Sequence, residues 1–252
     1  MGATAPLALS CAAIIEDGFA REDLRRIWAS IRATCEEAGT TIVTGDTKVM
    51  GHGELDGLVI NTTGVALTKR IVRDAGLRPG DRIIVTGTMG DHGLAIMATR
   101  NELALETTLK SDVAPVHQLV RRALEVGGDD IVAMKDPTRG GLSSALHEMA
   151  EKSNVGIIID EGAVPLREEV RAVGELLGID PLVSANEGKA VIAVRPEAAD
   201  SVLDAVRAHP LGKVAAIIGE CVAERPGFVI LDTGFGSRLL AEAEGELLPR
   251  IC

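Results

Sequence analysis

Residues 76–81, Gly-Leu-Arg-Pro-Gly-Asp, divide this chain of 252 residues into two parts. Glycine and proline so close together form turns and end helices and strands. Domains commonly contain roughly 150 residues, so the length suits one large domain or two ordinary ones. We therefore predict an N-terminal domain over residues 1–76 and a C-terminal domain over residues 77–233.

The part before the turn predicts a small set of strands with one helix. Strands are expected at 7–15, 41–46 and 58–65, and apolar residues at helical spacing from Leu24 to Cys35 indicate the helix. Nothing precedes the strand at 7–15, so we expect it to lack a partner. We expect the strand at 58–65 to pair with the one at 41–46, across a polar loop that contains Lys48 and His52.

The part after the turn alternates between strands and helices. We predict strands at 82–87, 155–160, 189–195, 213–223 and 227–232, and helices from about Leu94, at 113–126, 139–152, 165–177 and 196–208. This order is not a simple βαβ repeat, which favours an α+β fold in which helices cover one side of a mixed sheet. After Gly234 the pattern weakens, so we expect a flexible tail over 234–252 that does not belong to a packed core.

Composition and charge exclude several classes of function. The formal net charge of −11 and the presence of only one Trp, three Phe and no Tyr disfavour a nucleic-acid partner. No apolar run approaches the roughly 20 residues that a membrane span needs, and no basic region precedes the apolar N-terminus. The four cysteines lie far apart, which disfavours a zinc site or a disulfide framework. These features predict a cytoplasmic protein without a membrane partner.

Two glycine-containing segments follow predicted strands and carry groups that bind phosphate or metal ions. In residues 45–48, Gly-Asp-Thr-Lys, the Asp46 carboxylate suits Mg²⁺ and the Lys48 ammonium suits a phosphate or a developing oxyanion. The alternative is a hairpin turn with solvated charges. Residues 87–93, Gly-Thr-Met-Gly-Asp-His-Gly, resemble an anion-binding loop between a strand and a helix, or simply a tight turn.

Two further loops combine acidic and basic side chains. Residues 136–141, Asp-Pro-Thr-Arg-Gly-Gly, precede a predicted helix, and they suit either binding or helix capping, with Thr138 as the N-cap. Residues 186–189, Asn-Glu-Gly-Lys, precede an apolar strand. Glu187 is a candidate general base if its surroundings raise its pKa, and the alternative is an ordinary polar turn. Among the histidines, His52 and His92 fall in glycine-rich loops and are the ones of interest.

The chain ends in a cysteine, Cys252, which is either an accident of the sequence or a carrier thiol. From Phe235 onward there are 18 residues, which reach roughly 60 Å when extended. A thiol of ordinary pKa is mostly protonated at neutral pH, so a nucleophilic role needs a nearby charge such as Arg250 or a receiving pocket.

Taken together, the segments 43–49, 86–93, 136–141 and 185–189 and the ending Pro-Arg-Ile-Cys resemble the HypE family of [NiFe] hydrogenase maturation factors. The resemblance covers essentially the whole chain. It implies a two-domain fold like that of aminoimidazole ribonucleotide synthetase (PurM), in the superfamily that includes selenophosphate synthetase. It also implies that HypF delivers a carbamoyl group to Cys252. ATP-dependent dehydration would then give a thiocyanate, and the cyano group would pass to iron in the HypC–HypD complex.

The resemblance also assigns roles to residues. Cys252 would carry the carbamoyl group, Lys48 and Glu187 would handle protons or stabilise an oxyanion, and Asp46 would contact the nucleotide or Mg²⁺. The residues expected to contact ATP are Gly45, Asp46, Gly90, His92, Asp136, Thr138 and Arg139.

Members of this family begin with a further segment that carries a glycine-rich phosphate loop and acidic residues for ATP and magnesium. This sequence starts after that segment, so we expect a truncated N-terminal domain, which in the family forms a homodimer. Two alternatives remain. One is another ATP-dependent enzyme of the superfamily, such as a relative of thiamine-monophosphate kinase. The other is an ATP-incompetent homologue that only binds HypF or HypC–HypD.

Overall fold

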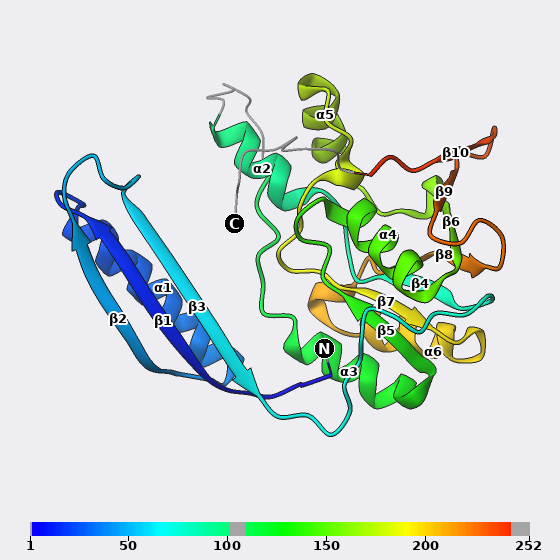
Figure 1. Cartoon of the computed structure of the whole chain (residues 1–252), viewed down its shortest axis with the longest axis horizontal. Coiled ribbons are helices and arrows are strands. Elements are labelled where there is room, and N and C mark those ends of the chain that lie inside the picture. Colours follow the sequence, from blue (N-terminus) through cyan, green and yellow to red (C-terminus); the bar gives the residue numbers. More distant parts are fainter. Residues whose placement is uncertain (1, 101–108, 243–252) are drawn as a thin grey trace. The chain divides into compact units, whose positions relative to one another are not determined.

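The computed structural model describes residues 2–100 and 109–242 of the chain (Figure 1). It divides the chain into an N-terminal unit, Gly2–Ile71, and a C-terminal unit that begins at Val72. Among the described helices, none is both long enough and apolar enough to span a membrane.

The N-terminal unit is a three-stranded sheet with one helix. It consists of β1 (Pro6–Glu16), α1 (Arg21–Ala38), β2 (Ile42–Met50) and β3 (Leu58–Ala66). The strand order is β2-β1-β3, with β1 parallel to β2 and antiparallel to β3. Two expectations are therefore wrong: β1 has partners on both sides, and β3 pairs with β1 and not with β2. The reason is that the α1 crossover places β2 parallel beside β1, which leaves the other edge of β1 for β3.

One face of this small sheet packs against α1. The helix turns its apolar residues Leu24, Ile27 and Trp28 inward, and each is half-buried. On the strands, Cys11 and Ala13 of β1 are the buried apolar residues of this unit. The helix ends where Gly39 adopts a positive φ of 68° and its N–H bonds back to the last turn, a conformation that favours glycine.

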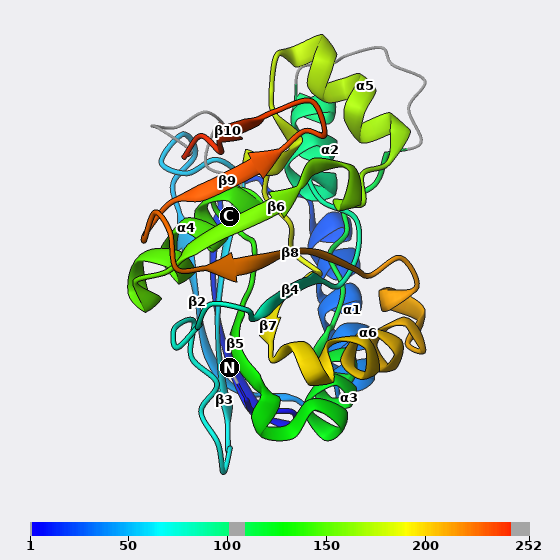
Figure 2. The same cartoon turned by 90° about the vertical axis from the view of Figure 1, so that its right-hand side faces the viewer.

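The C-terminal unit contains a seven-stranded sheet in the order β10-β9-β6-β8-β4-β7-β5, which Figure 2 shows from top to bottom. Neighbouring strands run antiparallel except for β6 and β9, which are parallel. The strands are β4 (Arg82–Val85), β5 (Ile131–Lys135), β6 (Gly156–Asp160), β7 (Val191–Val194), β8 (Ala216–Val222), β9 (Val229–Asp232) and β10 (Ser237–Leu239). The sheet is mixed, as predicted.

Helices cover both faces of this sheet, whereas the sequence predicted one covered side. The helices are α2 (Asp91–Arg100), α3 (His117–Gly127), α4 (Gly141–Ser153), α5 (Glu168–Leu177) and α6 (Ala199–Arg207). Short 3₁₀ helices lie at Gly128–Asp130, Glu161–Ala163, Pro181–Val183, Pro196–Ala198 and Pro210–Gly212. Val85 packs in the core beneath α4, whereas Ile84 packs in the core with α3 and α6. Successive side chains of a strand point to opposite faces, so the apolar strand β7 and the apolar residues 83–85 of β4 need cover on both.

The sequence did not predict two strands, β5 and β10. The second lies in the segment expected to be a flexible tail, and that expectation is wrong over residues 237–241. Leu240 is buried and its N–H donates to the Val229 carbonyl at 2.9 Å, while the Ser143 hydroxyl donates to the Ala241 carbonyl at 2.6 Å. Pairing with β9 satisfies the backbone of this segment. Residues 243–252, and with them Cys252, lie outside the described residues.

Candidate functional site

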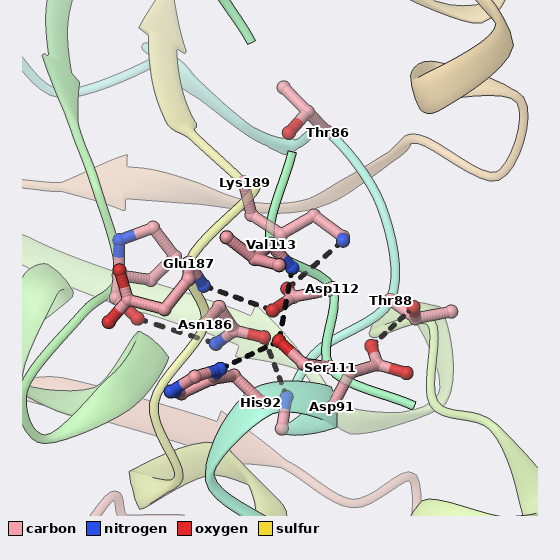
Figure 3. Close-up of polar contacts among 12 residues, drawn as sticks. Thr86, Thr88, Asp91, His92, Ser111, Asp112, Val113, Asn186, Glu187 and Lys189 are labelled. Carbon is pink, nitrogen blue, oxygen red and sulfur yellow. Dashed lines mark hydrogen bonds and ion pairs between the residues drawn. The ribbon is translucent and has the colours of Figure 1, made fainter. Parts of the chain in front are cut away.

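Two loops of the C-terminal unit that are far apart in the sequence meet at the start of α2 (Figure 3). The Gly90 N–H donates to the Asn186 side-chain oxygen at 2.8 Å, and the Gly93 N–H donates to the Ala185 carbonyl at 3.0 Å. The Ser184 hydroxyl donates to the Gly90 carbonyl at 3.2 Å. These bonds join the predicted anion-binding loop 87–93 to the predicted acid–base loop 186–189, and they commit the Gly90 and Gly93 N–H groups within the protein.

Glycine is required where these loops touch. Gly90 has φ of +81°, and a Cβ there would lie 2.9 Å from the Pro181 carbonyl oxygen. Gly141 has φ of +61°, and a Cβ there would lie 2.5 Å from the Ser184 carbonyl oxygen. The segment 181–189 therefore packs closely against both the start of α2 and the start of α4.

Glu187 lies in the loop 184–189, and one of its carboxylate oxygens makes no hydrogen bond to the described residues. Its Oε1 is buried and has no hydrogen-bond partner among the described residues. Burial raises the pKa of Glu187, and the charges of Asp112 and Asp136 raise it further, whereas His92 opposes the rise. A carboxylate with a raised pKa is a better proton acceptor at neutral pH than an exposed one. Glu187 is a candidate general base on the condition that its surroundings raise its pKa, and they do.

His92, in the first turn of α2, lies beside this carboxylate. Its Nδ1 is 2.8 Å from the Ser111 hydroxyl, and its Nε2 is buried without a hydrogen-bond partner in the described structure. The Ser111 hydroxyl also accepts the Val113 N–H at 3.2 Å. This arrangement fixes the ring and leaves Nε2 available to a ligand.

The first turn of α2 is held by a buried acid, Asp91. The Thr88 hydroxyl donates to its Oδ2 at 2.5 Å, and Arg167 forms an ion pair with its Oδ1 at 2.9 Å. Burial raises the pKa of Asp91, and Thr88 and Arg167 counteract that rise. Asp91 therefore anchors the loop that positions His92.

The segment 136–141 also contacts the loop 184–189. The Pro137 carbonyl accepts the backbone N–H of Asn186 at 3.0 Å, and Asp136 and Arg139 are exposed beside it. The N-cap of α4 is Gly140, with φ of 73° and no side-chain cap, so the expectation of Thr138 as the N-cap is wrong. The Thr138 carbonyl instead accepts the Gly141 N–H in a tight turn.

The remaining predicted residues belong to the N-terminal unit. Lys48 does not lie in a loop: Gly45, Asp46 and Lys48 are exposed positions within β2, because that strand continues to Met50. Asp46 and Lys48 are two residues apart and share a face of the sheet. A Cβ on Gly45 would lie 1.9 Å from the Cys11 carbonyl oxygen, so only glycine permits this strand contact.

The described residues contain no group of three His, Cys, Asp or Glu side chains that could hold a metal ion by themselves. Mg²⁺ that enters with a nucleotide needs only one or two carboxylates, since phosphates and water supply the other ligands. The exposed Asp46 carboxylate, whose Oδ1 accepts the Thr47 N–H at 2.8 Å, fits this lesser requirement.

Comparison with known proteins places the chain in a family. Residues 1–68 match the N-terminal domain, and residues 78–232 the C-terminal domain, of the AIR synthase related proteins. Carbamoyl dehydratase HypE of Bradyrhizobium diazoefficiens is 50% identical over 260 residues, which cover all of this chain and 74% of that protein. This chain belongs to the HypE family of carbamoyl dehydratases.

Solved HypE structures have the same fold. A crystal structure of HypE in complex with ATP has a TM-score of 0.94 and 42% identity, and covers all of this chain and 76% of that one. In a HypE–HypF complex, the matched chain has a TM-score of 0.91 and 41% identity, with 96% of this chain and 79% of that chain covered. The predicted PurM-like α+β fold of the HypE family is therefore confirmed.

Two further residues that build this site, Asp112 and Ser111, were not among the predicted ones. Asp112 accepts hydrogen bonds from the Glu187 backbone and from the Lys189 ammonium, and Ser111 contacts His92. Neither forms a recognisable motif with its neighbours in the sequence. The available signal was weak: two small polar residues that stand just before the predicted helix at 113–126.

Proposed function

We propose that this chain catalyses the ATP-dependent dehydration of a carbamoyl group carried on Cys252, and so supplies the cyanide ligands of a [NiFe] hydrogenase. The observation that carries the proposal is the Glu187 carboxylate, which has a raised pKa and a free buried oxygen beside the free Nε2 of His92. The family supports the assignment, since a relative that is 50% identical to this chain is named carbamoyl dehydratase HypE.

The reaction turns the thiocarboxamide S–C(=O)–NH₂ into the thiocyanate S–C≡N. The amide oxygen is a poor leaving group, so ATP transfers a phosphoryl group to it and becomes ADP. The nitrogen gives one proton to Glu187, and the electron pair left on nitrogen forms the C=N bond of a phosphorylated imidate. The C–O bond then breaks, the C≡N bond forms, and the second nitrogen proton leaves with the departing phosphate. Lys48 stabilises the negative charge on the carbonyl oxygen.

Cys252 can reach Glu187 by chain length alone. Ser143 of α4 bonds to the Ala241 carbonyl and so anchors the chain there. Gly141 lies two residues before Ser143 and contacts Ser184. Ser184 in turn lies three residues before Glu187. At about 3.8 Å between consecutive Cα atoms, the chain steps of this path add up to at most about 19 Å, and each of the two contacts adds one spacing between touching residues. The 11 residues after Ala241 span roughly 36–40 Å when extended.

The cofactor and partners follow from the family. The ATP complex of a HypE structure supports ATP as the phosphoryl donor, and we assign Asp46 as a Mg²⁺ contact and Gly45 and His92 as ATP contacts. Asp136, Thr138 and Arg139 complete that set. Gly90, which the sequence also predicts as an ATP contact, has its N–H and carbonyl bonded to Asn186 and Ser184. The HypE–HypF complex supports HypF as the carbamoyl donor. We further propose the HypC–HypD complex as the cyanide acceptor, a homodimer formed through the N-terminal unit, and a cytoplasmic location.

Intact-mass measurement tests the proposal. The chain is incubated with HypF, carbamoyl phosphate and ATP, beside Cys252→Ala and, as a matched control, Cys35→Ala, which removes a half-buried thiol. We expect the wild type and Cys35→Ala to gain one carbamoyl group and then lose one water, and Cys252→Ala to do neither. Carbamoylation without water loss contradicts the dehydratase assignment and favours a chain that acts only as a binding partner.

A further inference from the structure

Asp112 is the best-connected buried charge near Glu187, and no motif of the sequence includes it. Its side chain is 1% exposed, and each of its two carboxylate oxygens accepts one hydrogen bond from the loop 186–189 (Figure 3). Oδ1 accepts the Glu187 backbone N–H at 3.0 Å, and Oδ2 accepts the Lys189 ammonium at 3.0 Å. The carboxylate therefore spans the loop on either side of Gly188.

The backbone around Asp112 presses directly on the same loop. A Cβ on Gly188 would lie 2.0 Å from the Asp112 carbonyl oxygen and 2.9 Å from the Ala114 nitrogen. On the other side, a Cβ on Gly87 would lie 2.7 Å from Cε of Lys189, so this side chain passes close to the Gly87 backbone. The segment 111–114 and the loop 186–189 thus pack closely on each other.

The residue before Asp112 orients His92. Because Ser111 holds Nδ1 at 2.8 Å, the other ring nitrogen, Nε2, is kept in the buried position where it has no partner in the described chain. Two consecutive residues of one short segment therefore contact both Glu187 and His92, each of which has a buried atom without a hydrogen-bond partner among the described residues.

The charges around Glu187 are few. Asp112 and Asp136 add negative charge, His92 acts in the opposite direction, and Lys189 adds a positive charge that Asp112 pairs. Because Asp112 is the buried one of the two acids, its charge is screened least by water.

We propose that Asp112 is a positioning residue of the dehydration reaction, which holds the Glu187 backbone and the Lys189 ammonium so that the Glu187 carboxylate faces the reacting nitrogen. This inference rests on the proposed function. Asp112 itself does not touch the substrate. Its negative charge has a second effect, which is to keep the Glu187 carboxyl basic.

The test uses single turnover of the full chain, carbamoylated on Cys252 by HypF and then purified, with ATP added at a series of pH values. Asp112→Asn keeps the shape and the acceptor for the Glu187 N–H but loses the charge and the Lys189 ion pair. Asp200→Asn, an exposed acid in α6, removes one charge from the same unit as a matched control.

We expect Asp112→Asn to slow water loss by about 100-fold, the scale of a misplaced catalytic group. The acid limb of its rate profile should move to lower pH, since removal of a negative neighbour lowers the pKa of Glu187. Carbamoylation by HypF and the profile of Asp200→Asn should stay as in the wild type. A slower rate with an unmoved limb, or an unchanged rate, overturns the proposal, whereas a wild type that never loses water overturns the proposed function instead.

Lys189→Gln provides the second test if Asp112→Asn does not fold. It leaves the Asp112 carboxylate bound to the Glu187 N–H but without its positive partner, so the acid limb should move to higher pH. A limb that stays in place, or moves to lower pH, contradicts the role given to Asp112.

Discussion

Replacement of Asn186 by alanine should destabilise the C-terminal unit to a degree that its hydrogen bonds allow us to work out. The side chain is 1% exposed, accepts the Gly90 N–H at 2.8 Å, and donates to the carbonyls of Ser184 and Pro137 at 3.2 and 3.4 Å. In alanine the buried Gly90 N–H loses its partner, which costs about 1–3 kcal/mol. The two longer bonds add about 1 kcal/mol together, because the Pro137 carbonyl keeps the backbone N–H of residue 186.

The expected loss is therefore about 2–4 kcal/mol. For a unit of this size, 1 kcal/mol corresponds to roughly 2–4 °C, so Tm should fall by about 4–16 °C. Differential scanning calorimetry of the full chain measures this shift, and Asn61→Ala, at an exposed position of β3, serves as the control. If Asn186→Ala shifts Tm no more than Asn61→Ala, the bond between the two loops contributes nothing to stability and the reasoning fails.

Three further predictions test other parts of the site. Glu187→Gln should reduce the dehydration rate by about 10²–10⁴-fold and leave carbamoylation intact. In the wild type, the dehydration rate should rise with pH through the raised pKa of Glu187. Intact-mass kinetics measure both effects. Gly188→Ala should lower both Tm and the dehydration rate because its Cβ meets backbone atoms, whereas Gly236→Ala, with open space around it, should change neither. The hydrogen bond from Lys152 lowers the pKa of Asp74, so it stabilises the fold at neutral pH and this stabilisation is lost as pH falls through the lowered value. Lys152→Met should flatten that loss of Tm on acidification.

The sequence predicted the elements whose pattern is local. The apolar run of β7 and the helical spacing of α1 each lie within one continuous segment, so periodicity identifies them. The four loops singled out from composition also include those that meet in the C-terminal unit, since glycine, aspartate and asparagine mark chain reversals between strands and helices.

The errors concern strand pairing and short elements, which depend on distant residues. β5 has only five residues, Ile-Val-Ala-Met-Lys, and three of these also favour helices, so its strand conformation comes from pairing with β7. The segment 237–241 lacks the alternation of apolar and polar residues that predicts a strand, and it is held by β9 and by Ser143. The sequence predicts a loop at Lys48 because the exposed residues of β2 lack the alternation that a half-buried strand shows.

Asp112 could not be predicted for a different reason. It acts on residues 75 and 77 positions away, and its two bonds depend on its position against the loop 186–189. A lone aspartate in a loop has many solvated counterparts in this acidic chain, so its residue type carries no information about burial. Only the three-dimensional arrangement distinguishes it from the exposed acids.

The glycines in these motifs have a role that differs from the one their pattern suggests. A glycine-rich loop after a strand indicates free N–H groups for phosphate, yet Gly90, Gly141 and Gly188 each stand where a Cβ would lie within 3 Å of another segment's backbone. Their absent side chains let three segments pack directly on one another. These contacts within the protein position the loop that carries Glu187. It follows that substitution of these glycines should impair proton transfer through lost geometry more than it weakens ATP binding, a difference that ATP titration calorimetry beside single-turnover rates of Gly188→Ala would reveal.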